Sequence, residues 1–271
     1  MDYVAHMHRE LVDFQAAVAR AAEQGDVAPL VPSCPGWSVS DLVGHLGGVH
    51  RYVGRVVRDR LLEPPDPDDL RLYDLPDDLA GWPMPETAPN RGPVTPALTT
   101  WFAEGAETVV ALLRERDPAE KVWTWSREQS VGFWRRMQAI EAAVHRWDAQ
   151  CAVEAPAPLD PELARDAVTQ TFEVMAPRRR ASQEAPPGSG ECYRFRRTDG
   201  PEVWTVRFED DDVRLSVGEA EADADADADA ELRGPASELA LFLWHRMPAR
   251  RLTMTGDPSL FERYFVLVPP V

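Results

Sequence analysis

Apolar residues recur every three or four positions through most of the first half of the chain, which is the spacing of an amphipathic helix. The first such stretch covers residues 3–22, and the others cover about 38–62, 96–116 and 133–151. Ser38 precedes the second stretch and Asp41 follows three residues later, the pattern of a capping box. Residues 64–96 are rich in proline and acidic residues and predict a long irregular connection. Four helices with one long crossover predict a four-helix bundle.

The pattern changes beyond Ala155–Pro158, a short Pro-Ala segment that predicts a linker. The second half alternates helical patterns with short runs of period two, and therefore predicts an α+β domain. We expect strands at 192–197, 203–208, 213–217 and 252–255, helices at 161–176, 237–246 and 257–265, and a polar loop at 178–191. The fold class is thus α plus α+β, with a bundle at 1–154 and an α+β domain at 159–271.

Composition and charge narrow the range of partners. The 271 residues carry a formal net charge of -17, which argues against nucleic acid and anionic membranes as partners. No apolar run is long enough for a membrane span, no secretory signal is visible, and three cysteines without metal-type spacing predict free thiols in a cytoplasmic protein. Residues 219–231, where alanine alternates with acidic residues, predict a solvated loop.

Three residues form the main candidate site. Side chains four positions apart lie within roughly 40° of each other on a helix, so Glu141 and His145 would share a face, and His45 lies in an apolar stretch of another helix. Two imidazoles and one carboxylate suit a divalent metal ion and leave a coordination position open. Zinc is the first choice, and nickel or ferrous iron would suit the same ligands. Spacing alone somewhat favours the alternative, a surface Glu–His pair and an unrelated core histidine.

Two further residues have weaker claims. His50 lies about 140° around the helix from His45 and should not share the ligand face; it would contact substrate or thiol, or support the site from behind. Asp148 lies three residues beyond His145. It would either support that histidine or form an ion pair on the helix surface with Arg146 or another neighbour.

The motifs around these residues resemble those of one family. Residues 34–46, CPGWSVSDLVGHL, look like the N-terminal signature of the mycothiol-dependent maleylpyruvate isomerase family, which belongs to the DinB-like metal-binding bundles, and residues 141–148, EAAVHRWD, resemble its fourth-helix motif. In the second half, LRGPASEL at 232–239, LWHR at 243–246 and TGD at 255–257 are similar to the family's C-terminal domain, which has a sterol-carrier-like α+β fold.

This resemblance implies a metal held by His45, Glu141 and His145, which match the family's ligand positions. It also implies that Arg246 faces the cleft and holds an anionic group, since a guanidinium forms two parallel hydrogen bonds with a carboxylate. Many relatives carry a histidine just before the glutamate, where this chain has Ile140. That departure leaves the substrate class open.

The function that follows is a metal-dependent enzyme of the isomerase or thiol S-transferase type. A low-molecular-weight thiol, mycothiol in the family, would be held as thiolate at the metal and would attack a small anionic electrophile. One alternative is a hydrolase or lyase that uses metal-activated water. Another is a non-catalytic metal-binding regulatory protein.

Overall fold

The computed structural model describes residues 1–219, 228–257 and 259–270, and the chain divides into two compact units, residues 1–157 and 158–271. The first unit is helical and the second contains a sheet with helices, which confirms the predicted fold class. In the described residues, no helix combines the length and the apolar character needed to cross a membrane. The three cysteines are free, as predicted.

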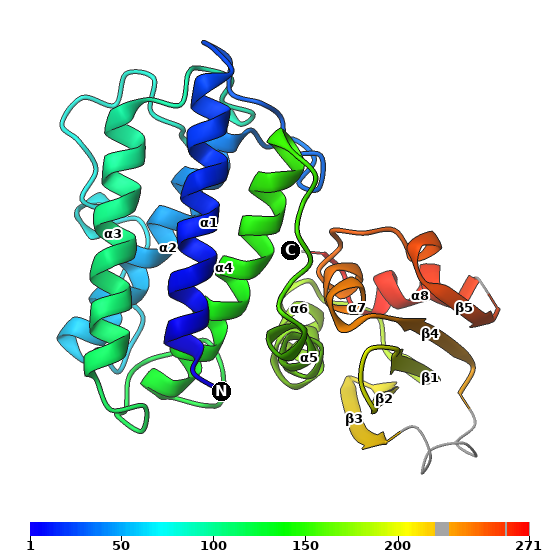
Figure 1. Cartoon of the computed structure of the whole chain (residues 1–271). Coiled ribbons are helices and arrows are strands. Elements are labelled where there is room, and N and C mark those ends of the chain that lie inside the picture. The colour runs from blue at the N-terminus through cyan, green and yellow to red at the C-terminus, as the bar shows by residue number, and fades with distance from the viewer. Residues whose placement is uncertain (220–227, 258, 271) are drawn as a thin grey trace. The chain divides into compact units, whose positions relative to one another are not determined.

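The first unit consists mainly of α1 (Tyr3–Glu23), α2 (Val39–Asp59), α3 (Pro96–Glu115) and α4 (Val131–Val153), which lie side by side in Figure 1. Helix α1 packs mainly on α4, and α2 packs mainly on α3. The predicted capping box is present, because the Ser38 hydroxyl accepts from the Asp41 N–H while the Asp41 carboxylate accepts from the Ser38 N–H at 2.7 Å. This cap fixes the point at which α2 begins.

The connection between α2 and α3 is irregular, as predicted, apart from the short helical turns η1 (Leu70–Tyr73) and η2 (Pro85–Thr87). Polar contacts fasten it to the bundle. The indole Nε1 of Trp101 donates to the carbonyl oxygens of Tyr73 and Asp74 at 3.0 and 3.1 Å. The backbone N–H of Asn90 donates to Asp41 at 2.9 Å. The segment therefore has a defined course across α2 and α3.

The second unit begins with α5 (Pro161–Gln170), a π-helical turn η3 (Thr171–Met175) and α6 (Ala176–Ser182). Its sheet has the strand order β3-β2-β1-β4-β5; β1 and β4 pair in parallel, and the other neighbouring strands pair antiparallel. The strands are β1 (Gly188–Arg197), β2 (Glu202–Asp210), β3 (Asp212–Glu219), β4 (Ala230–Gly234) and β5 (Thr253–Gly256), and the later helices are α7 (Ala236–Leu243), η4 (Ala249–Arg251) and α8 (Ser259–Leu267).

Aromatic side chains form the core of this unit. Phe195 and Trp204 are paired across β1 and β2 and are both buried. The ring of Phe172 from η3 lies 5.1 Å from that of Phe195, and Tyr264 from α8 lies 5.9 Å from it on centroids. The helices therefore cover one face of the sheet, and burial of these rings stabilises the unit.

The structure corrects two expectations for the second unit. The predicted polar loop at 178–191 is wrong, because α6 extends to Ser182 and β1 begins at Gly188. Arg179 and Arg180 are buried there and donate to backbone carbonyls. Their charge predicted exposure to solvent, but their side chains lie in the interior. Of the acidic segment 219–231, residues 220–227 lie outside the described residues, while its two ends belong to β3 and to β4, a strand that the pattern did not predict.

Candidate metal centre

The candidate ligands come from two helices of the first unit. Glu141 and His145 lie one turn apart on α4, and His45 lies on α2. One potential ligand atom from each residue lies within 4.8 Å of the other two. His45 Nε2 is 3.6 Å from Glu141 Oε1, and the centroids of the two imidazole rings are 5.1 Å apart. The structure therefore brings the three predicted residues together. The alternative, in which Glu141 and His145 form a surface pair and His45 is an unrelated core histidine, does not describe this arrangement.

The cluster lies at the boundary between the core and solvent. The side chain of His45 is 36% exposed and that of Glu141 is 14% exposed, whereas His145 is buried. The Trp37 ring lies 5.1 Å from the His45 ring and limits its freedom. A small molecule would therefore reach the cluster from the side of His45.

His145 is oriented by Asp148, which is fully buried. Its Nδ1 lies 3.0 Å from Asp148 Oδ2, and because a carboxylate accepts, Nδ1 carries the proton. Nε2 is then the nitrogen that a metal would use. The Ser33 hydroxyl donates to Asp148 Oδ1 at 2.6 Å, and the Cys34 thiol lies 3.4 Å from Oδ2. Burial of Asp148 makes the predicted alternative of a helix-surface ion pair wrong.

Glu141 is held from a second side. Gln138 Nε2 donates to Glu141 Oε2 at 3.0 Å, a contact between positions one helical turn apart that sequence reasoning missed. Burial raises the pKa of the Glu141 carboxyl, but His45 and His145 outweigh that effect, so its pKa lies below the ordinary value. Glu141 is therefore a carboxylate at neutral pH and a competent metal ligand.

The donor set fits a divalent ion. A tetrahedral zinc ion with ligands at about 2.1 Å would place its ligand atoms about 3.4 Å apart. The His45–Glu141 separation of 3.6 Å is close to this value, and the limit of 4.8 Å for the cluster leaves only a modest contraction. Three protein ligands would leave a position for a thiol or water.

The remaining predicted residues lie elsewhere. His50 is fully buried, with its ring 5.4 Å from that of Phe102, and it is not in the ligand cluster. In the described part of the chain, neither ring nitrogen of His50 has a hydrogen-bond partner. Arg246 is half-buried in the second unit, where its Nη1 donates to the Trp244 carbonyl at 3.0 Å. Its contact with a substrate stays a prediction.

Two protein families match the chain. Residues 4–150 match the family described as "Mycothiol maleylpyruvate isomerase N-terminal domain", and residues 162–263 match the family described as "MDMPI C-terminal domain". Two solved structures have a similar fold. One is a mycothiol-dependent maleylpyruvate isomerase, with a TM-score of 0.57, 14% identity, and coverage of 94% of this chain and 92% of the other. The other is a histidine-to-alanine mutant of such an enzyme, with a TM-score of 0.58 and the same identity and coverage. No curated protein matches the sequence significantly.

Proposed function

Since the chain belongs to the mycothiol-dependent maleylpyruvate isomerase family, we propose that it is a metal-dependent enzyme that uses a low-molecular-weight thiol to act on a small anionic electrophile. Membership of this family favours mycothiol as the thiol. The proposed reaction is isomerisation of an activated cis double bond. The observation that carries the proposal is the convergence of His45, Glu141 and His145, with Asp148 buried behind His145.

His45, Glu141 and His145 would hold the metal ion, zinc in the first instance. A bound zinc ion supplies a positive charge that lowers the pKa of a thiol or water in its open position. Asp148 holds the proton on His145 Nδ1 and fixes the plane of the ring. Gln138 fixes Glu141 through one carboxylate oxygen. These contacts keep the ligands in place before a thiol arrives, so little reorganisation is required.

The substrate would carry a carboxylate beside its electrophilic carbon. Addition of a thiolate to an activated double bond leaves a single bond, rotation about that bond follows, and elimination returns the thiol unchanged. We propose that Arg246 binds the carboxylate, because a guanidinium recognises it through paired charge-assisted hydrogen bonds. Arg246→Lys should therefore raise KM more than it lowers kcat.

Thiol dependence tests this function. Metal-loaded protein is incubated with maleylpyruvate as the probe, with and without mycothiol, and the isomer and any thiol adduct are measured. We expect turnover that requires mycothiol and does not consume it. A stoichiometric adduct would assign S-transfer. Equal turnover without thiol would overturn the thiol mechanism in favour of activated water, and absence of any reaction with bound metal would favour a regulatory protein.

Asp148→Asn should weaken metal binding about 10–100-fold. The asparagine amide would donate to Nδ1 and move the His145 proton to Nε2, the nitrogen needed for the metal. Competition with a chromogenic chelator measures the affinity. Asp13→Asn, on the exposed face of α1, is the matched control and should leave the affinity unchanged. An unchanged affinity in Asp148→Asn, with the fold intact by circular dichroism, would show that Asp148 does not orient the ligand.

A further inference from the structure

We propose that a cavity between α2 and α3, with Arg51 in its wall, binds a small oxyanion through a phosphate or carboxylate group. The cavity has a volume of about 270 Å³ and is lined by residues of both helices and of the connection between them. None of the three candidate metal ligands belongs to its wall. It would therefore be a second site, separate from the three metal ligands, although His50, the predicted contact for substrate or thiol, also lines it.

The buried guanidinium of Arg51 is the main observation. Its side chain is only 8% exposed, and it lies 4.0 Å from the centroid of the Trp101 ring. Its Nη2 donates to the Trp101 carbonyl at 2.8 Å. Among the described residues, its buried Nε and Nη1 have no hydrogen-bond partner. A buried charged donor without partners is costly, and an anion in the cavity, which Arg51 lines, would offset part of that cost through its charge.

Two glycines make room for this arrangement. A Cβ atom at Gly105 of α3 would lie 2.3 Å from Arg51 Nη1, and one at Gly47 of α2 would lie 2.2 Å from Trp101 Cζ3. Neither position has space for a side chain while Arg51 and Trp101 keep their places. The guanidinium and the indole beneath it are therefore seated by the backbone of both helices.

The charges around the cavity leave Arg51 poorly compensated. The nearest carboxylate in an ion pair with it, Asp74, is 3.9 Å from Nε, is 78% exposed and is too far for a hydrogen bond. Glu104 also belongs to the wall. Burial lowers the pKa of Arg51, and the charges of Asp74 and Glu104 offset only part of that effect. An anion against the guanidinium would oppose this lowering and stabilise the charged form further.

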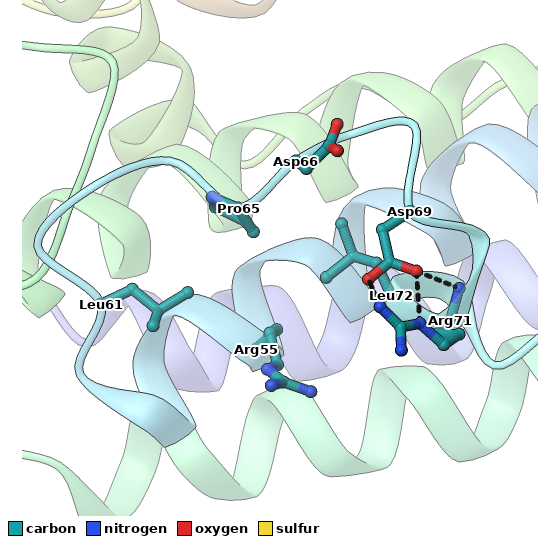
Figure 2. Close-up of a pocket in the computed structure, with 7 residues that line it drawn as sticks. All are labelled: Arg55, Leu61, Pro65, Asp66, Asp69, Arg71 and Leu72. Atoms are coloured by element: carbon teal, nitrogen blue, oxygen red, sulfur yellow. Dashed lines mark hydrogen bonds and ion pairs between the residues drawn. The ribbon is translucent and has the colours of Figure 1, made fainter.

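Further arginines line the cavity. Arg55, Arg58 and Arg71 belong to the wall. Figure 2 shows an adjoining pocket of about 300 Å³, which shares Arg55, Arg71 and Leu72 with the cavity and in which Asp69 holds Arg71. Arg55 is paired with Asp59. Carboxylates therefore offset the charges of Arg55 and Arg71, and Arg51 is the buried guanidinium on which the proposed anion binding depends.

The volume sets the size of the ligand. Pockets for drug-sized molecules have volumes of about 300–1,000 Å³, so a cavity of 270 Å³ suits an anion of few atoms or the anionic end of a metabolite. Phosphate and carboxylate groups both accept from a guanidinium. Inorganic phosphate and malonate are therefore the two probes, because they show whether the cavity binds a phosphate or a carboxylate group.

The test titrates phosphate and malonate separately into the full chain by calorimetry. The protein is freed of metal with a chelator that is then removed, so that anions cannot bind to a metal ion, and sodium chloride keeps the ionic strength constant. We expect saturable binding at one site by at least one probe and a rise in Tm at saturation. The probe with the higher affinity identifies the chemical group that the cavity recognises.

Two variants locate the binding. Arg51→Met should weaken it at least tenfold, and so should Gly105→Ala, whose methyl group displaces the end of the Arg51 side chain without removing its charge. Arg114→Gln on the exposed face of α3 is the charge control, and His45→Ala is the control for the metal centre; both should bind as the wild type does. If Arg51→Met fails to fold, Gly105→Ala decides.

Two results would overturn the proposal. One is the absence of saturable binding by either probe to the wild type. The other is equal affinity in the wild type and Gly105→Ala. Since His45→Ala keeps this cavity and Gly105→Ala keeps the three metal ligands, failure of this site and failure of the proposed function are distinguished.

Discussion

His45→Ala, Glu141→Gln and His145→Ala are each expected to lose the zinc ion that the wild type holds at one equivalent after dialysis. Binding of zinc at a site with four ligands has a free energy of about 10–16 kcal/mol. Loss of one ligand therefore costs roughly 3 kcal/mol of binding free energy, which is about two orders of magnitude in affinity. Thiol-dependent turnover should fall to background in all three variants. Metal analysis of the dialysed proteins and competition with a chelator measure the effect.

Matched substitutions outside the cluster separate loss of a ligand from loss of charge. His8→Ala on α1 and Glu107→Gln on α3 change exposed residues of the same types and should keep one equivalent of zinc. If the wild type binds no divalent ion, or if the three cluster variants bind it as tightly as the wild type does, the metal centre is wrong.

His50→Leu should remove much of the acid sensitivity of the first unit. Burial lowers the pKa of His50 to about 3, whereas a histidine in the unfolded chain has a pKa of about 6.5. Between these values the unfolded state holds a proton that the folded state does not. The free energy of unfolding therefore falls by about 1.4 kcal/mol for each pH unit of acidification below pH 6.5, which amounts to about 2 kcal/mol by pH 5.

Urea unfolding of the metal-free protein at pH 7, 6 and 5 measures this effect. Tryptophan fluorescence suits it, because seven of the nine tryptophans lie in residues 1–157. Leucine has no group left to protonate, so the variant should lose the slope due to His50. His245, whose pKa is lowered to about 4 by burial, keeps its own contribution in both proteins. Exposed His8→Leu should behave as the wild type does; an equal slope in His50→Leu would show that His50 is protonated in the folded protein.

Local signals predicted the parts of the structure that depend on neighbours in sequence. The capping box of Ser38 and Asp41 could be predicted from the sequence because both residues lie within one helical turn. The hairpin of β1 and β2 was readable because Asp199 and Gly200 mark its turn. Helical periodicity likewise placed Glu141 and His145 on one face and His45 in an apolar stretch of another helix, and the resemblance implied that all three are ligands; the structure brings them together.

Contacts between distant segments could not be predicted in this way. Strand β4 pairs in parallel with β1, and such a pair has no shared turn to reveal it. Arg179 and Arg180 indicated solvent by their charge, yet their donors reach carbonyls 64 and 87 residues away. Ser33 meets Asp148 across 115 residues. Each of these depends on tertiary packing that overrides the local preference.

The position of β3 at the edge of the sheet has a consequence for solubility. An edge strand offers unpaired backbone groups to which another chain could add and start an aggregate. The outward side chains of β3 include Asp212 and Arg214, which are 75% and 65% exposed. A strand added at this edge would bring another chain against these charges and strip them of water. Growth of an intermolecular sheet from this edge is therefore disfavoured.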